Sequence, residues 1–250
     1  MECFIVAESD IDLQSKTLTL RGDEARHAVR VLRISEGEHL MATTLQGFCY
    51  KARCIRSGQP SKNEWVCECS VEEILQEHNE PNIDLQLIQG ITQQQSKLEE
   101  IAEKVTEIGI SSFIPIYSKR TEKKTSNKER LERIITSACK QTHRARMPKL
   151  YEPMTYEKSL ELAHSEGRKI IVLHESAPLE NPLIGNLPKD RNVKISLVIG
   201  PEGGFDEAEV LLASRNYHAV IASLGVRRLR AETAAITAVA IAMSNDYTIA

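Results

Sequence analysis

The segment that runs through Val198 and ends at Ala235 limits the possible folds of this chain more than any other part. Two apolar runs, at residues 195–199 and 219–222, each lead through a glycine-bearing loop into a helical pattern. Consecutive strand–loop–helix units are typical of a parallel α/β sheet. Because ligands of such sheets bind at the loops that follow the carboxyl ends of strands, the sequence predicts a ligand site formed by these two loops.

The two loops differ in composition. The first reads Gly-Pro-Glu-Gly-Gly-Phe over residues 200–205, and its glycines allow positive φ angles and a close approach of the backbone to a ligand. It lacks the G-x-G-x-x-G pattern of a dinucleotide site. Asp206 and Glu209 follow as a capping-box pattern, which predicts the start of a helix. The second loop, residues 223–234, carries three arginines and Glu232. A neutral ligand does not require these charges, whereas a polyanion or a proton transfer does.

Apolar runs and helical stripes alternate from residue 83 to the C-terminus, which predicts a mostly parallel sheet with helices on both faces. Ser96 with Glu99, and Ser126 with Glu129, predict capping boxes at the start of two helices. The expected strands are residues 84–91, 110–117, 169–174, 195–199 and 219–222; helices are expected after Ser96, Ser126 and Asp206 and over residues 156–165 and 232–245.

Residues 1–75 have a different pattern, with short apolar runs separated by turn signals. The expected strands are residues 4–7, 18–20, 39–43, 48–55 and 65–71, and one short helix is expected over residues 25–32. Strands of this number and length favour a small barrel. The polar, acidic residues 76–82, with Pro81, are predicted to link the two domains.

Charge is distributed unevenly along the chain. Residues 119–149 contain eleven Lys or Arg against three Glu, whereas residues 63–96 contain seven acidic residues and no Lys or Arg. A basic surface that faces RNA explains this pattern, and a solvated helix face explains it equally well. The six cysteines show no C-x-x-C spacing, so we expect free, buried thiols and no metal. No apolar run is long enough for a membrane span and no secretory leader is evident, so we expect a cytoplasmic protein away from membranes.

The chain resembles the bacterial ribosomal RNA uridine-N3 methyltransferases of the RsmE type in two motifs. These are GPEGGF at residues 200–205 and LG-x-R-x-LR-x-ETA at residues 224–234. These enzymes belong to the SPOUT superfamily. The resemblance extends to residues 94–121 and 133–148, and more weakly to residues 27–33. It implies a PUA-like RNA-binding β-barrel at residues 1–75, a linker at 76–82, and a methyltransferase domain at 83–250. That domain is α/β, a SPOUT-type parallel sheet with a deep trefoil knot.

The resemblance also implies S-adenosylmethionine as methyl donor, held bent by backbone groups of three loops. Methyl transfer from a sulfonium is an in-line displacement that depends on positioning and requires no metal. The residues that match the donor site are Leu173, His174, Glu175, Ile199, Gly200, Glu202, Gly203, Gly204, Ser223, Leu224, Gly225, Arg228, Leu229 and Thr233. For Glu202 the alternative is to hold its loop through backbone amides, and for His174 it is a structural role.

Arg230 and Glu232 are the expected catalytic residues. Uridine N3 is a poor nucleophile until its proton leaves, so positive charge on an anionic uracil, or a base, would promote the reaction. Arg230 would stabilise the negative charge, and Glu232 would orient Arg230 or take the proton. The alternative for Glu232 is a favourable interaction with the helix dipole.

The resemblance implies small-subunit ribosomal RNA as partner, within the assembled small subunit, and a homodimer with the donor site at its interface. His27, Arg30 and Arg33 are spaced to share a helix face that contacts phosphates or solvent. The other expected RNA contacts are Arg120, Gln141, Arg144 and Arg146. Two alternatives remain: a SPOUT methyltransferase on another RNA (a tRNA or a ribose 2′-OH), and a non-catalytic RNA-binding assembly protein.

Overall fold

The computed structural model describes residues 1–62, 64–122, 126–190 and 193–244. The chain divides into two compact units. The first consists of Met1–Glu80 and Thr136–Met147, and the second of the described residues of Pro81–Ile135 and Pro148–Ala250. The break between Glu80 and Pro81 falls inside the predicted linker, and the segment Thr136–Met147 packs with the first unit. The domain boundaries of the sequence analysis stay predictions.

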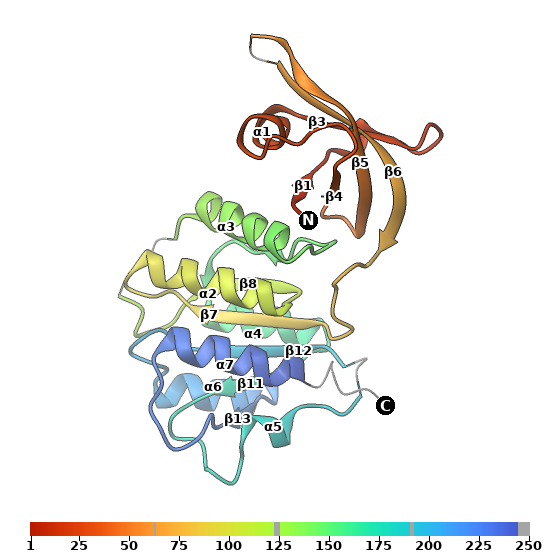
Figure 1. Cartoon of the computed structure of the whole chain (residues 1–250). Coiled ribbons are helices and arrows are strands. Elements are labelled where there is room, and N and C mark those ends of the chain that lie inside the picture. The colour runs from red at the N-terminus through yellow and green to blue at the C-terminus, as the bar shows by residue number, and fades with distance from the viewer. Residues whose placement is uncertain (63, 123–125, 191–192, 245–250) are drawn as a thin grey trace. The chain divides into compact units, whose positions relative to one another are not determined.

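The first unit is built on a curled six-stranded sheet in the order β1-β4-β5-β6-β3-β2 (Figure 1). Apart from the parallel pair β1–β4, neighbouring strands are antiparallel. The strands are β1 (Cys3–Ile5), β2 (Ile11–Asp12), β3 (Thr17–Arg21), β4 (His39–Thr43), β5 (Phe48–Ser61) and β6 (Glu64–Gln76). Alternate residues such as Leu18, Leu20 and Leu40 point into one apolar core. Because β1 and β2 lie at the two ends of the strand order, the predicted barrel takes the form of a half-barrel.

The short helix predicted at residues 25–32 is present as α1 (Gly22–Arg26), continued by a π-helical turn at His27–Val31. The expected common helix face for His27, Arg30 and Arg33 is wrong. Arg33 lies beyond the helix with a left-handed φ of 57°, and a π turn does not stack residues three apart as an α turn does.

The second unit contains a seven-stranded sheet, and its strand pairs in the described residues are all parallel, in agreement with the predicted mostly parallel sheet. Its order is β10-β8-β7-β12-β11-β13, with β9 beside β8. The strands are β7 (Leu85–Gly90), β8 (Ser112–Tyr117), β9 (Lys149–Leu150), β10 (Met154–Thr155), β11 (Lys169–Leu173), β12 (Ile195–Ile199) and β13 (Val220–Ala222). The central strands are buried on both faces, which explains why they are mostly apolar. Their buried polar residues include Ser196 and Gln86, whose side chains bond to each other at 2.8 Å.

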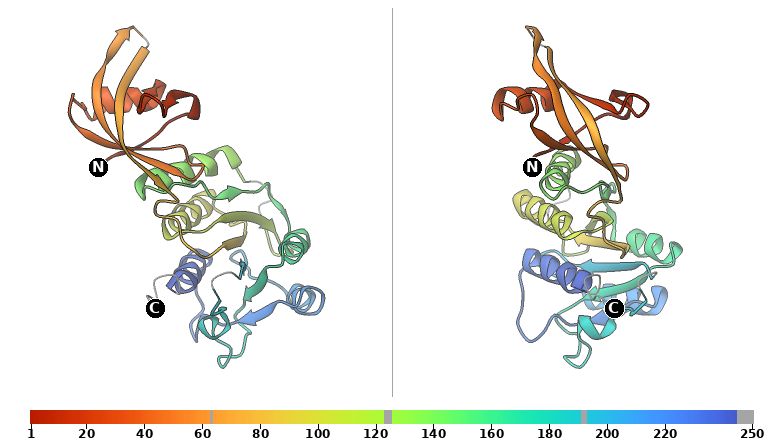
Figure 2. Two further views of the ribbon diagram at one scale, coloured as in Figure 1. Left: turned by 90° about the vertical axis from the view of Figure 1, so that its right-hand side faces the viewer. Right: turned by 45° about the vertical axis from the view of Figure 1, so that its right-hand side comes forward.

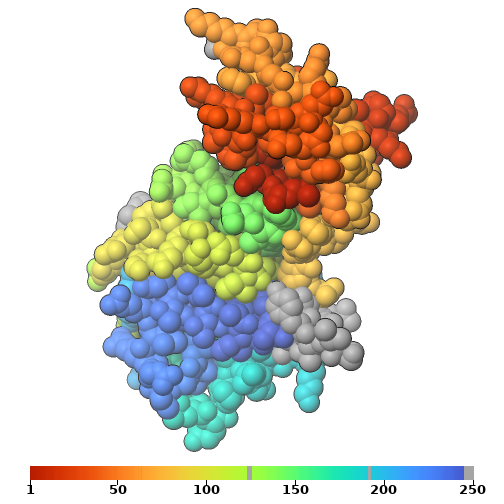
Figure 3. All heavy atoms as spheres, viewed as in Figure 1, coloured from red at the N-terminus to blue at the C-terminus, as the bar shows by residue number. Residues whose placement is uncertain are grey.

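Helices cover both faces of this sheet (Figure 2). On one face α4 (Tyr156–Ser165) and α6 (Glu207–Tyr217) pack on residues such as Val172 and Val198. On the other, α7 (Ala231–Ser244) contacts β7, β12 and α2 (Gln95–Ile108). The atoms of α2 and α7 form one continuous surface in Figure 3. The remaining helices are α3 (Lys128–Gln141) and α5 (Leu183–Asn186).

Helix starts were predicted with mixed success. Asp206 and Glu209 form the expected capping box. The capping box at Ser96 is wrong, because α2 begins at Gln95, after an extended Gln94, so that Ser96 already lies inside the helix. The box at Ser126 is wrong because the side chain of Asn127 accepts from the Arg130 amide instead.

Three further expectations concern the chain as a whole. The predicted end of the last helix, Asn245, lies outside the described residues, and the trefoil knot stays a prediction. All six cysteines are free and buried, as expected. Within the described ranges, no helix is both long and apolar enough to cross a membrane.

Candidate active site

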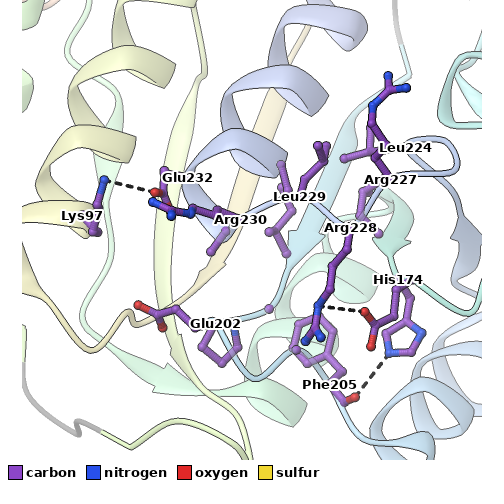
Figure 4. A pocket seen from close by; sticks show the side chains of 18 of the residues that line it. Lys97, His174, Glu202, Phe205, Leu224, Arg227, Arg228, Leu229, Arg230 and Glu232 are labelled. Carbon is purple, nitrogen blue, oxygen red and sulfur yellow. Dashed lines mark hydrogen bonds and ion pairs between the residues drawn. The ribbon is translucent and has the colours of Figure 1, made fainter.

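A cavity of about 530 Å³ opens at the carboxyl ends of β11, β12 and β13 in the second unit (Figure 4). β11 pairs with both other strands, so the loops that begin after Leu173, Ile199 and Ala222 lie next to one another. β7 is the other neighbour of β12, and the segment that follows it adds Gln93, Gln94 and Lys97 to the cavity wall. The parallel sheet thus brings together loops that are far apart in the sequence, as the sequence pattern predicts.

The loop after β12 is held by backbone geometry and one buried ring. Gly204 has a φ of 66°, a conformation that favours glycine. A Cβ atom on Gly90, at the end of β7, would lie 2.3 Å from the backbone nitrogen of Pro201, so only glycine lets the two segments pass this closely. The ring of Phe205 is 2% exposed and packs 4.7 Å, between centroids, from that of Tyr156 in α4.

Glu202 links this loop to the segment that follows β7. Its two carboxylate oxygens accept from the backbone N–H of Gln93 at 3.1 and 3.2 Å. This is the loop-holding role that the sequence analysis gives as the alternative for Glu202. On the outer side, the guanidinium of Arg120 donates to the carbonyl of Gly203 at 2.8 Å.

His174 has partners on both ring nitrogens. Nδ1 lies 2.7 Å from the hydroxyl of Ser176, and Nε2 lies 3.3 Å from the carbonyl oxygen of Phe205. The contact with Ser176 lies within the loop after β11, and the contact with Phe205 joins that loop to the loop after β12. This is the structural alternative given for His174.

The loop after β13 carries the cationic side chains. Its Gly225 has a φ of 106° and open space where a Cβ would stand. Arg228 pairs with Glu175 at 3.2 Å, and both side chains are more than half exposed. Pairs this exposed contribute little to stability, so Arg228 remains free to turn towards a ligand.

Glu232 lies in the first turn of α7 and is 9% exposed. Its carboxylate pairs with Lys97 Nζ of α2 at 3.0 Å, and Lys97 also pairs with Glu100 at 3.1 Å. In Figure 4 the side chains of Arg230 and Glu232 lie side by side, on the side of the cavity nearest Lys97. The site therefore has a cluster of two cations around one carboxylate.

The cations decide the charge of this carboxylate. Burial, the largest single influence, favours the neutral acid of Glu232. A backbone hydrogen bond, the hydrogen bond from Lys97 and the positive charges of Lys97 and Arg230 together outweigh burial and lower the pKa of Glu232. The hydrogen bonds to Glu232 and Glu100 raise the pKa of Lys97. Glu232 is therefore ionised at neutral pH.

Most of the predicted donor and catalytic residues meet at this cavity. Two do not line it. Gly203 packs against the Arg120 side chain outside it, and Thr233 is exposed. The lining residues among those predicted are Leu173, His174, Glu175, Ile199, Gly200, Glu202, Gly204, Ser223, Leu224, Gly225, Arg228, Leu229, Arg230 and Glu232.

Eight of the described lining residues were not singled out in the sequence. Five of them lie within the two loops that were predicted to form the ligand site: Pro201, Phe205, Arg227, Ala231 and Ala234. The other three are Gln93, Gln94 and Lys97. A signal for them existed, because the segment that resembles the RsmE type begins at Gln94 and follows a predicted strand end.

The predicted RNA contacts belong to both units. In the first unit, His27 packs edge-on against Phe4, Arg30 lines a separate hollow, and Arg33 and Gln141 are exposed. In the second unit, Arg120 supports the Gly203 carbonyl.

For Arg144 the prediction of an RNA contact is corrected. Its side chain is 3% exposed and pairs with Glu80 at 2.7 Å, so the guanidinium is inside the first unit and already neutralised. Arg146 is exposed and pairs with Glu77. Among the described residues, no group of three or more His, Cys, Asp or Glu is arranged to hold a metal ion.

The chain is similar to known proteins along most of its length. The family model of the RNA methyltransferase domain matches residues 78–243, and that of the RNA methyltransferase PUA domain matches residues 20–55. A Bacillus subtilis protein named ribosomal RNA small subunit methyltransferase E is 30% identical over 90% of this chain and 89% of its own. A protein of the same name from Aquifex aeolicus is 32% identical over 91% of this chain and 94% of its own.

A solved structure matches both units. The crystal structure of a ribosomal RNA small subunit methyltransferase E from Neisseria gonorrhoeae, bound to S-adenosyl methionine, superimposes with a TM-score of 0.80. It is 26% identical, and the match covers 96% of this chain and 95% of that one.

Proposed function

We propose that this chain, which belongs to the family of ribosomal RNA small subunit methyltransferase E, methylates N3 of one uridine in small-subunit ribosomal RNA. The resemblance inferred from GPEGGF and LRAETA is thereby confirmed at the level of the family. The protein is an S-adenosylmethionine-dependent methyltransferase that acts on small-subunit ribosomal RNA. The choice of N3 of uridine rests on the sequence resemblance and on the charges around Arg230. The observation that carries the proposal is the cavity at the strand ends with Lys97, Arg230 and Glu232 on one side.

The cavity fits the donor in size and lining. About 530 Å³ lies in the usual range of small-molecule sites, roughly 300–1,000 Å³. Gly204 and Gly225 have positive φ angles, and among the described residues no atom outside their chain neighbours lies within 4 Å of where their Cβ atoms would stand. At these two positions the backbone itself therefore forms the cavity wall. Leu173, Ile199 and Leu229 supply an apolar lining. When bound, S-adenosylmethionine supplies an electrophilic methyl group on a positively charged sulfur.

The chain's own charges then act on the uracil. Loss of the N3 proton leaves negative charge on the ring and its carbonyl oxygens, and a cation placed beside them stabilises it. Arg230 is the exposed cation of the cluster, and we assign it this role. Glu232 is poorly suited as the base, because a general base works best when its pKa is near the working pH and the pKa of Glu232 is lowered. We therefore assign Glu232 to positioning: its carboxylate holds Arg230 and Lys97 on the same side of the cavity.

The assembly state belongs to the same proposal. We propose a homodimer in which a second copy covers the donor site, acting on the assembled small subunit in the cytoplasm. Val226, in the loop after β13, is 74% exposed, and an apolar side chain beside the cavity is suited to cover by another chain. A monomer at micromolar concentration with full activity, measured by analytical ultracentrifugation beside turnover, would refute the dimer.

The test of function is direct. Purified protein is incubated with labelled S-adenosylmethionine and small ribosomal subunits that lack the modification, with free RNA alongside, and nucleosides are identified by mass spectrometry. We expect label as 3-methyluridine from the subunits. Label as another nucleoside would refute the choice of N3. No label, with donor binding intact by calorimetry, would refute small-subunit RNA as substrate.

A further inference from the structure

A second hollow, of about 510 Å³, lies in the first unit and has no part in the site described above. Its walls come from α1, the π-helical turn after it, and the hairpin of β5 and β6. The lining residues are Gly22, Asp23, Arg26, Arg30, Gln59, Lys62 and Trp65. Three are cations, one is an acid, and one is the only tryptophan of the chain.

The cations of this hollow differ from other cations of the same half-barrel. Several of those are neutralised by neighbours; the pairs are Arg21–Asp10, Lys51–Glu73, Arg53–Glu72 and Arg56–Glu68. Within the described residues, by contrast, the side chains of Arg26, Arg30 and Lys62 make no ion pair or hydrogen bond. Unpaired guanidinium groups that converge on one hollow have all their donors available for a phosphate.

Trp65 adds an aromatic wall. Its side chain is partly buried against the apolar core of the first unit, which holds the ring in place and leaves part of it accessible. A fixed aromatic ring beside phosphate-binding cations is the combination with which proteins hold single-stranded nucleic acid, because every base has a face that can stack. Asp23 would repel a second phosphate, whereas its carboxylate can accept from a ribose 2′-OH.

We propose that this hollow binds one nucleotide of a single-stranded segment of the RNA substrate, away from the target uridine. The base stacks on Trp65, the phosphate lies among Arg26, Arg30 and Lys62, and the ribose hydroxyl faces Asp23. The identity of the ligand as RNA rests on the proposed function. The site itself goes beyond that function, because it adds Arg26, Lys62 and Trp65 to recognition and explains why Arg30 is left unpaired.

Trp65 makes the site directly observable, since tryptophan emission can come from no other position. Emission is followed during titration with a short oligouridylate, and with uridine monophosphate in a second arm. We expect saturable quenching by the oligonucleotide and much weaker quenching by the monophosphate. The Arg26→Ala/Arg30→Ala variant should need more oligonucleotide for the same quenching. The slope of log affinity against log salt should be smaller in magnitude by about 1.4, from two contacts at about 0.7 each.

The matched control is Arg53→Ala/Arg56→Ala, which removes the same charge from β5 outside the hollow and should bind like the parent. An unchanged emission spectrum of each free variant verifies that the half-barrel is folded. Equal binding by the parent and the Arg26/Arg30 variant would overturn the proposal. So would RNA binding without a change in emission, or quenching by the monophosphate equal to that by the oligonucleotide. The assay involves no methyl transfer, so a failure of the methylation experiment is separate from a failure here.

Discussion

Replacement of Arg144 by Met should destabilise the first unit strongly and leave RNA affinity unchanged. The guanidinium pairs with Glu80 through Nη2 at 2.7 Å and Nε at 3.3 Å, and the two side chains are 3% and 8% exposed. Glu80 also accepts from the backbone N–H of Arg146 at 2.8 Å. The substitution removes both guanidinium contacts and leaves the buried Glu80 carboxylate with the Arg146 amide.

The magnitude follows from burial. Removal of one partner from a buried ion pair costs about 3–5 kcal/mol, because the remaining charge has lost its hydration without compensation. That is a large share of the roughly 5–15 kcal/mol by which a domain is stable. Arg146→Met is the matched control two residues along. This substitution also breaks an ion pair with a glutamate, but the side chains of Arg146 and Glu77 are 55% and 42% exposed. The expected loss in free energy of unfolding is therefore only about 0–1 kcal/mol.

The assay is urea unfolding followed by the emission of Trp65, which lies in the same unit as both arginines. The two free energies of unfolding are compared at equal m-values. RNA affinity is measured in parallel where each variant is folded. A loss below about 1 kcal/mol for Arg144→Met, together with weaker RNA binding, would refute the buried role and restore Arg144 as an RNA contact.

Three further outcomes are expected. Arg230→Ala should reduce turnover sharply while donor binding by calorimetry stays the same, and an unchanged turnover would contradict its role beside the uracil. Lys97→Met removes a cation that lowers the pKa of Glu232, so the pKa of Glu232 should rise and the acid limb of the pH–turnover profile should move to higher pH. Lys97→Arg should keep the parent profile. An unmoved acid limb in the Met variant would exclude this coupling. Gly90→Ala places a Cβ against the Pro201 backbone, so donor affinity should fall, and an unaltered affinity by calorimetry would mean that the loop can shift at no cost.

Much of the second unit was predictable because its signals are local. A strand buried on both faces is mostly apolar, and the predicted strand at residues 195–199 has the same bounds as β12. The Asp206–Glu209 box was read correctly because both partners lie within one turn. Once the strands were known to be parallel, their carboxyl ends had to lie along one edge, which located the two loops of the site.

The failures occurred where more than one local partner was available. Ser126 and Asn127 are both good capping residues, and in the structure it is the Asn127 side chain that accepts from the Arg130 amide. The stretch around His27 was read with α-helical spacing, whereas the chain forms a π turn there and ends its helix before Arg33.

The sequence by itself determined the alternation of strands and helices, the two loops at the cavity, and the motifs that carry the family resemblance, since all of these depend on neighbours in the chain. Only the tertiary structure decided which charges are free. Arg144 and Arg230 look alike in the sequence, yet one is buried on Glu80 and the other is exposed beside Glu232. Lys97 reaches Glu232 only because the sheet brings α2 against α7. A charge interacts with whatever lies within a few ångströms, and for these side chains that neighbour comes from a distant part of the chain.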